Sequence, residues 1–149
     1  MKAGELCIRN VATATGDESV VAAARRMVAC GAEELIVVDE RAGLRRPIGL
    51  VTDRDLVVRV LTRGDCAPAA LPIGEVMRRD LVTASEDDDI DRVVATMREH
   101  AMRRIPIVDR RGGLHGILAI DDVLGWMRAQ IEAAHQLLEH PPASPAHVR

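Results

Sequence analysis

The chain repeats its own pattern at an interval of seventy residues, and this repeat restricts the possible folds more than any other feature. Val11–Asp39 align without a gap on Leu81–Asp109. Several residues are identical in the two copies, and hydrophobic positions agree more widely still. A repeat of this length indicates two copies of one supersecondary unit, which bury their apolar faces together. We therefore expect an α/β fold made of two similar halves.

Each copy is expected to form a short strand, a helix, two strands joined by a turn, and a second helix. In the first copy Asp17 is the candidate N-cap of the helix, apolar residues follow at helical spacing, and Gly31 can end it. Asp87 takes the place of Asp17 in the second copy. The runs Leu35–Val38 and Ile105–Val108 are aliphatic and end at an Asp and a polar turn, which predicts strands.

Other signals place the remaining elements. Pro106 favours an edge strand or a strand start, because proline has no N–H to donate. The second helix of the first copy should begin near Thr52. The last helix should begin near Asp121 and continue to His140, where two prolines stop it.

Composition and charge exclude several classes of function. The net charge is −3 and Trp126 is the sole aromatic residue, whereas single-strand nucleic-acid binders need a basic groove and stacking rings. Arginines do cluster locally, so a nucleic-acid-binding regulator stays a minor alternative; the clusters are Arg45–Arg46, Arg78–Arg79, Arg103–Arg104 and Arg110–Arg111. The first residues lack the apolar run of a signal peptide, and no stretch is apolar enough to span a membrane. We expect a cytoplasmic protein without a membrane partner.

No side-chain pattern points to catalysis or to a metal. Cys7, Cys30 and Cys66 have neither zinc spacing nor a CxxC pair, so reduced thiols are expected. The five histidines are scattered and are interpreted as surface residues. The acidic run Glu86–Asp89 lies at a helix start, where the helix dipole explains it. We therefore assign no catalytic residue and no metal ligand, and we do not expect an enzyme.

Two segments of the first copy resemble the repeat of the CBS (cystathionine-β-synthase) domain family. They are Leu-Ile-Val-Val-Asp at Leu35–Asp39 and Gly-Leu-Val-Thr-Asp-Arg-Asp at Gly49–Asp55, and the resemblance extends roughly from Leu6 to Trp126. It implies two repeats packed sheet to sheet about a pseudo-twofold axis, with a cleft that commonly holds adenosine-containing ligands. We expect a first repeat at 1–63, a linker at 64–73, a second repeat at 74–128, a helix extension at 129–140 and a disordered tail at 141–149.

Thr52 and Asp55 lie at a strand-to-helix junction, where free amide groups and the helix dipole favour an anion. The resemblance implies that Thr52 and nearby amides face a phosphate while Asp55 accepts hydrogen bonds from ribose hydroxyls. The alternative is structural. Thr-x-x-Asp is close to a capping box, and capping alone would explain both residues. The two roles are compatible.

The resemblance also implies that Arg103 and Arg104 reach a phosphate bound at the Thr/Asp motif of the other repeat, a task suited to the planar guanidinium group. The alternative is a pair of solvated surface arginines. Leu81, Val82 and Pro106 are expected to wall the base. The first ligand site is therefore assigned to Thr52, Arg54, Asp55, Leu81, Val82, Arg103, Arg104 and Pro106.

The second copy departs from the pattern at its own site. Ala119 stands where the first copy has Thr52, and Glu33-Glu34 stand where the second copy has arginines. Glutamates repel a phosphate, so one working site is expected, with a weaker second site at Thr13, Val37 and Asp122. Alternatively, Glu33-Glu34 and Arg103-Arg104 pair with each other as surface ion pairs worth at most about 1 kcal/mol.

The expected function is regulatory: an energy-sensing module that binds AMP, ADP or ATP and acts on an unidentified effector protein in trans. A ligand-free oligomeric scaffold is the main alternative. A homodimer is expected because the last helix carries one long apolar stripe, which consists of Ile120, Val123, Leu124, Met127, Ile131, Ala134 and Leu138.

Overall fold

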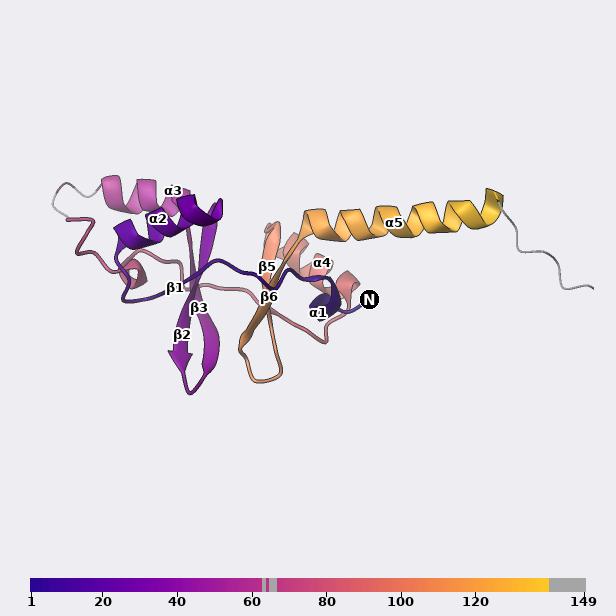
Figure 1. Ribbon diagram of the computed structural model, residues 1–149, viewed down its shortest axis with the longest axis horizontal. Coiled ribbons are helices and arrows are strands. Elements are labelled where there is room, and N and C mark those ends of the chain that lie inside the picture. Colours follow the sequence, from indigo (N-terminus) through magenta and orange to yellow (C-terminus); the bar gives the residue numbers. More distant parts are fainter. Residues whose placement is uncertain (63, 65–66, 140–149) are drawn as a thin grey trace, which may run out of the picture.

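The computed structural model describes residues 1–62, 64 and 67–139. Two α/β halves, each with its own three-stranded sheet, lie side by side, and one long helix projects from the second half (Figure 1). The predicted fold class and the predicted order of strand, helix, strand, strand and helix are confirmed in both halves.

The first half contains a sheet of strand order β1-β2-β3, in which β1 runs parallel and β3 antiparallel to β2. Its elements are β1 (Thr13–Thr15), α2 (Val20–Cys30), β2 (Glu34–Arg41), β3 (Leu44–Thr52) and α3 (Asp53–Leu56), with a π-helical turn at Val57–Leu61 and a 3₁₀ turn at Ile73–Glu75. Gly31 ends α2 at a positive φ of 61°, as predicted, because a residue without Cβ adopts this conformation most readily.

The second half repeats this arrangement with strand order β4-β5-β6. Its elements are α1 (Ala3–Leu6), β4 (Ala84–Ser85), α4 (Ile90–Glu99), β5 (Arg104–Val108), β6 (Leu114–Ala119) and α5 (Ile120–Glu139). The last helix therefore begins where the sequence indicates. His140, the tail 141–149, Arg63 at the end of the predicted first repeat, and two linker residues, Asp65 and Cys66, lie outside the described residues.

The predicted N-caps Asp17 and Asp87 are wrong. A turn follows each first strand, so each helix begins later, and the cap of α2 is Ser19, whose hydroxyl accepts from the Ala22 amide at 3.2 Å. Asp17 instead accepts from the Thr15 hydroxyl at 2.6 Å within that turn. Asp87 binds Arg110 on the neighbouring hairpin. An acidic residue close to a helix start was mistaken for the cap itself.

Pro106 lies in the central strand β5, so the predicted edge or strand-start position is wrong. The first half explains why the position tolerates proline. There the Ile36 amide donates to the Ala12 carbonyl at 3.1 Å. Pro106, the counterpart of Ile36, has no N–H, and β4 pairs with β5 only from Ala84 onward. The strand next to Pro106 is shorter, and the carbonyl of Val82, the counterpart of Ala12, receives no hydrogen bond from this position.

Two short segments, residues 1–8 and 71–78, cross between the halves, and each packs into the core on the other side; we call them the crossing segments. Ala3 and Cys7 are buried in the second core, whereas four residues at and after the end of the predicted linker are buried in the first core: Leu71, Ile73, Val76 and Met77. Each crossing segment ends in a backbone bridge to an outer strand, Ile8 with Ile117 and Arg78 with Leu50. The packing units thus differ from the sequence segments 1–63 and 74–128.

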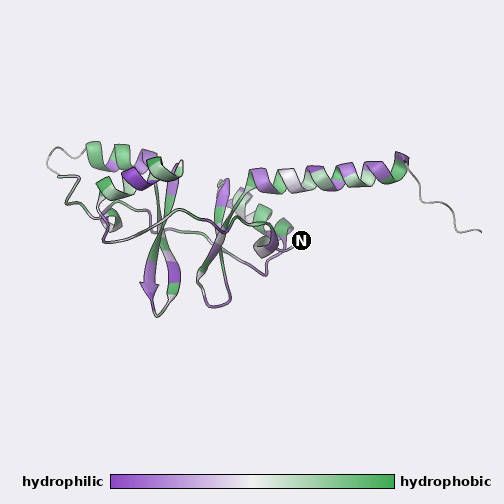
Figure 2. Cartoon of the chain, in the orientation of Figure 1, coloured by the Kyte–Doolittle hydropathy of each residue, from purple (hydrophilic) through white to green (hydrophobic). Residues whose placement is uncertain are grey.

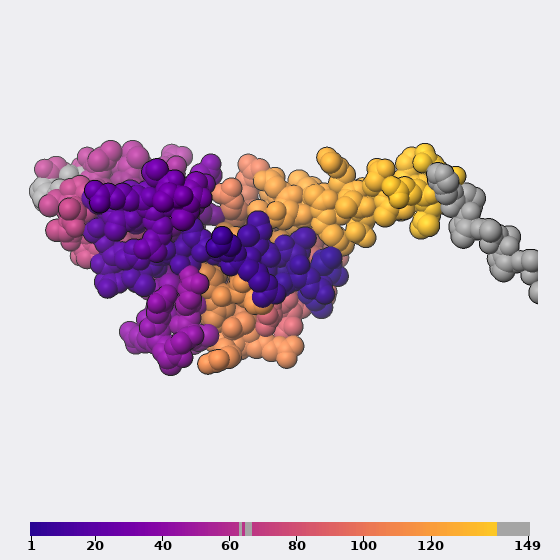
Figure 3. Space-filling model, viewed as in Figure 1, coloured from indigo at the N-terminus to yellow at the C-terminus, as the bar shows by residue number. Residues whose placement is uncertain are grey.

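The helix α5 leaves much of its apolar stripe uncovered. Figure 2 shows hydrophobic residues along the projecting helix, and Figure 3 shows that the helix extends beyond the two halves. Val123 is buried in the second core, but Ile131 is 68% exposed and Leu138 is 80% exposed. Among the described residues, no helix has the length and apolar character needed to cross a bilayer.

The close approach of the first crossing segment generates a testable prediction. A Cβ at position 116 would lie 2.6 Å from the Cys7 sulfur and 2.8 Å from the Ile8 carbonyl oxygen. We expect Gly116→Ala to lower the free energy of unfolding by about 1–3 kcal/mol in urea titrations, because the segment must move. Gly125→Ala is the control; apart from the backbone of α5 itself, nothing lies within 4 Å of that Cβ, and helix propensity predicts a gain of up to about 1 kcal/mol. Equal stabilities of parent and Gly116→Ala would contradict the tight packing.

Candidate functional site

Two cavities flank the contact between the halves. Cavity A has a volume of about 380 Å³ and is lined by Glu34, Leu50, Arg78, Asp80, Leu81, Val82, His100, Ala101, Met102, Arg103, Arg104 and Pro106. Cavity B has a volume of about 530 Å³ and is lined by Asn10, Val11, Ala12, Thr13, Arg26, Cys30, Gly31, Ala32, Glu33, Glu34, Ile36, Arg104 and Ile117. Most residues of one lining are repeat counterparts of the other, so the cavities are the two equivalent sites of the pseudo-twofold.

Both cavities share Glu34 and Arg104, which are themselves repeat counterparts. The Arg104 guanidinium lies 3.4 Å from a Glu33 carboxylate oxygen and 3.7 Å from Glu34 Oε1. This is the ion pairing between the copies that the sequence left as an alternative. Arg103 instead lies 3.5 Å from Asp121 of its own half. Exposed pairs of this kind contribute at most about 1 kcal/mol each.

Glu34 occupies an unfavourable position for a charge. Its side chain is 19% exposed, and its Oε1 atom is buried without a hydrogen-bond partner. Burial raises the pKa of Glu34, because a carboxylate loses hydration, and the nearby Arg104 opposes this shift. The one carboxylate common to both cavities is therefore the one that is least well accommodated.

The structure brings together five of the residues assigned to the first site. Leu81, Val82, Arg103, Arg104 and Pro106 all line cavity A.

The Thr/Asp motif lies beside cavity A rather than in its lining. Thr52 is the cross-strand partner of Glu34, and Asp55 forms an ion pair with Arg78 at 3.2 Å. Arg54 is exposed outside the cavity.

Thr52 and Asp55 form a complete capping box at the start of α3. The Thr52 hydroxyl accepts from the Asp55 amide at 3.1 Å, and Asp55 Oδ2 accepts from the Thr52 amide at 3.0 Å. The Asp55 side chain is only 14% exposed and also lies 3.7 Å from Arg59. Capping is therefore a confirmed role of the motif, and Arg78 connects it to the cavity.

Arg78 is a site residue that sequence reasoning missed. Its backbone pairs with Leu50, with N···O distances of 2.8 and 2.9 Å, while its side chain joins Asp55 to the lining of cavity A. A signal was available, because extending the repeat alignment three residues before Val11 places Ile8 opposite Arg78. Ile8 is not among the residues that line cavity B, so that cavity has no counterpart of the Arg78 charge.

The residues of the weaker second site do not converge. Thr13 lines cavity B, and its hydroxyl accepts a hydrogen bond from Arg45. Val37 is fully buried in the first core, so its side chain cannot contact a ligand in the cavity. Asp122 accepts from the Ala119 amide at 3.1 Å, and no hydroxyl completes the box.

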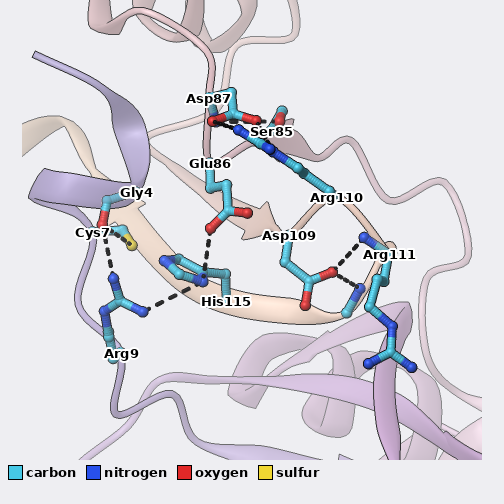
Figure 4. Close-up of polar contacts among 11 residues, drawn as sticks. Gly4, Cys7, Arg9, Ser85, Glu86, Asp87, Asp109, Arg110, Arg111 and His115 are labelled. Atoms are coloured by element: carbon cyan, nitrogen blue, oxygen red, sulfur yellow. Dashed lines mark hydrogen bonds and ion pairs between the residues drawn. The ribbon is translucent and has the colours of Figure 1, made fainter.

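His115 is not a surface residue, which corrects one of the histidine assignments. Figure 4 shows it between Glu86 and Arg9; its Nδ1 lies 3.2 Å from the carboxylate and 3.4 Å from the guanidinium, and its side chain is 16% exposed. Arg9 also donates to the Gly4 carbonyl at 3.3 Å, so this cluster attaches the first crossing segment to the second half.

Burial raises the pKa of the nearby Cys7 thiol. Within the described ranges, no group of three or more His, Cys, Asp or Glu residues could hold a metal ion.

Curated relatives of the chain are similar over most of its length. It is 34% identical to the uncharacterized protein MK0525 of Methanopyrus kandleri over 81% of the chain, which spans 60% of that protein. It is 31% identical to the CBS domain-containing protein YhcV of Bacillus subtilis, with 76% of each protein covered.

Two solved structures share the fold. The cytosolic domain of the Mg²⁺ channel MgtE in complex with ATP has a TM-score of 0.69 and 28% identity, covering 83% of this chain and 48% of the other. The CBS domain pair of MJ0100 in complex with 5′-methylthioadenosine and S-adenosyl-L-methionine has a TM-score of 0.70 and 23% identity, covering 87% and 98%. The family model described as CBS domain matches twice, at residues 3–62 and 73–129. The chain belongs to the CBS domain family and contains two of its repeats.

Proposed function

We propose that the chain is a regulatory module that binds an adenine nucleotide in cavity A and acts on an effector protein in trans. The observation that carries this proposal is the lining of cavity A, which combines apolar residues with three arginines, Arg78, Arg103 and Arg104. Guanidinium groups suit phosphate oxygens. Leu81, Val82 and Pro106 suit a flat base.

The backbone beside Pro106 offers the base a polar contact. Because Pro106 has no N–H, the Val82 carbonyl is available to accept from the exocyclic amino group of adenine. Beside the cavity, the Asp55 carboxylate forms an ion pair with Arg78 at 3.2 Å. A nucleotide could replace this ion pair on both sides, with ribose hydroxyls donating to Asp55 and the phosphate accepting from Arg78.

The shared residues suggest how binding is transmitted. A phosphate in cavity A competes with Glu33 and Glu34 for Arg104, so binding would weaken an ion pair that joins the two halves. A ligand shifts a conformational equilibrium only if it binds one arrangement better than the other. The loss of the ion pair between Arg104 and the two glutamates would give the ligand different affinities for the two arrangements of the halves. The adenosine ligands of the MgtE and MJ0100 structures support the choice of ligand class, and AMP, ADP and ATP are the candidates.

We also infer that the module is a homodimer joined through α5. Its exposed apolar stripe, which includes Leu124, Met127, Ile131 and Leu138, is longer than the second core covers. A second copy of the same helix would bury this stripe symmetrically.

Calorimetric titration with AMP, ADP and ATP tests the nucleotide site. We expect one nucleotide per chain, with an affinity that falls as salt increases. The double variant Arg103→Glu, Arg104→Glu should lose at least about tenfold in affinity, equivalent to about 1.4 kcal/mol, whereas Arg128→Glu on the exposed part of α5 should not. Asp55→Ala should weaken binding more than Asp122→Ala, although both lose a helix cap. Two equivalent sites per chain, or unchanged affinity in the double variant, would refute the assignment.

The burial of the Glu34 carboxylate predicts that the stability of the fold depends on pH. Its pKa is raised in the folded state from an ordinary value of 4.5, so the folded chain retains a proton that the unfolded chain releases, and stability falls as the pH rises through that value. Glu34→Gln should therefore melt at a higher temperature than the parent at pH 7, and the gain should disappear below about pH 4. The exposed Glu33→Gln is the control for charge alone. A gain that is the same at both pH values would show another cause.

Light scattering tests the dimer. We expect the mass of two chains at micromolar concentration, and a shift to one chain in Ile131→Glu, which places a charge on the stripe. Ala129→Glu adds the same charge to another face of α5 and should remain dimeric. A parent protein that is monomeric under these conditions would contradict the inference.

A further inference from the structure

A third cavity, which we call the hairpin cavity, lies where the β2–β3 and β5–β6 hairpins approach each other; the hairpins are neighbours at the bottom of Figure 1. Its volume is about 450 Å³. Arg46 comes from the first half, Arg79 directly follows the second crossing segment, and Arg110 and Arg111 come from the second half. No carboxylate is among the residues that line it. This is a concentrated positive site in a chain of net charge −3.

Two of these four arginine side chains have hydrogen-bond or ion-pair partners among their neighbours. Arg110 forms two hydrogen bonds to Asp87, at 2.8 and 3.2 Å, and Arg79 donates to the Gly74 carbonyl at 2.8 Å. The side chains of Arg46 and Arg111 form no ion pair or hydrogen bond with any residue that the structure describes. Like charges in one hollow repel each other, and an anion would remove that repulsion.

The fold itself does not require this charge. In the first half, Arg45 donates to the Thr13 hydroxyl and lies 3.5 Å from Glu40. The repeat counterpart of Glu40 is Arg110, and the counterpart of Thr13 is Thr83, which lines the hairpin cavity. A carboxylate in one copy is thus an arginine in the other, and the threonine hydroxyl is left for a ligand.

We propose that the hairpin cavity binds a phosphate chain, a linear anion with two or more linked phosphates. Guanidinium groups from three segments can each make charge-assisted contacts to phosphate oxygens. A nucleic acid fits less well, because the hollow lies between two hairpins and the chain's one aromatic residue, Trp126, is on α5 rather than in this lining.

Such a ligand would connect the halves at a second place. Arg46 belongs to one sheet and Arg111 follows a strand of the other, so one anion would bridge them. Leu81 lines both the hairpin cavity and cavity A, which couples the two sites by direct contact. The inference does not depend on nucleotide binding in cavity A.

Calorimetry with inorganic tripolyphosphate tests the proposal on the full chain. We expect one ion bound per chain and at least about a tenfold loss of affinity in the double variant Arg46→Gln, Arg111→Gln, which removes two charge-assisted contacts. Arg128→Gln controls for net charge and should bind tripolyphosphate as the parent does, whereas Arg104→Gln reports how much of the ion binds in cavity A rather than in the hairpin cavity. The proposal is overturned if the parent does not bind, if the double variant binds equally well, or if Arg104→Gln loses the affinity instead.

Titrations of the same double variant with ATP and AMP identify which kind of molecule supplies the phosphate chain. A loss for ATP but not for AMP would assign the phosphates to a nucleotide tail, whereas a loss for tripolyphosphate alone would assign them to a free polyphosphate. Either result upholds a phosphate-chain site. Binding of a short DNA duplex that depends on Arg46 and Arg111, without binding of tripolyphosphate, would replace the proposal with a nucleic-acid surface.

Discussion

The backbone bridge between each crossing segment and an outer strand is the constraint on which the rest of the structure depends. Each segment leaves its own half, fills the core of the other, and pairs at Ile8 or Arg78 with the strand that leads to a site helix. A glycine lies close to each crossing, at Gly49 and Gly116, because a side chain there would collide with the segment. The halves therefore cannot separate without exposing two cores, and the cavities between them keep a defined shape.

The two halves repeat one backbone arrangement, but equivalent positions in them differ in charge. Cavities A and B have largely equivalent walls, yet Arg103 of cavity A is replaced by Glu33 in cavity B, and Arg78 lines cavity A while its counterpart Ile8 does not line cavity B. The hairpin cavity shows the same kind of difference, with Arg110 in place of Glu40. A duplicated fold thus has cavities of different charge through a few positions, while the buried residues that determine its architecture are apolar in both copies.

The sequence was sufficient for the order of elements, the Thr52 cap and the two-half architecture, because repeat, periodicity and capping act over short distances along the chain. It was insufficient wherever the environment of a residue depends on a segment that is distant in the sequence. Pro106 is tolerated in a central strand because β4 is short, and His115 is covered because the first crossing segment returns to the second half. Arg78 was missed for the same reason, since its importance comes from Asp55, which lies 23 positions earlier. The Asp17 error was local: two turn residues were not distinguished from a helix start.

Glu34 and Arg104 each belong to the walls of both cavities. A substitution at either position therefore alters two binding environments in a single mutational step. Gene duplication usually allows one copy of a site to diverge while the other retains its role. Here the two copies cannot diverge independently at Glu34 and Arg104, because both cavities share these residues. Divergence of the two cavities must instead accumulate at peripheral residues such as Ile8 and Glu33, whose counterparts Arg78 and Arg103 line one cavity alone.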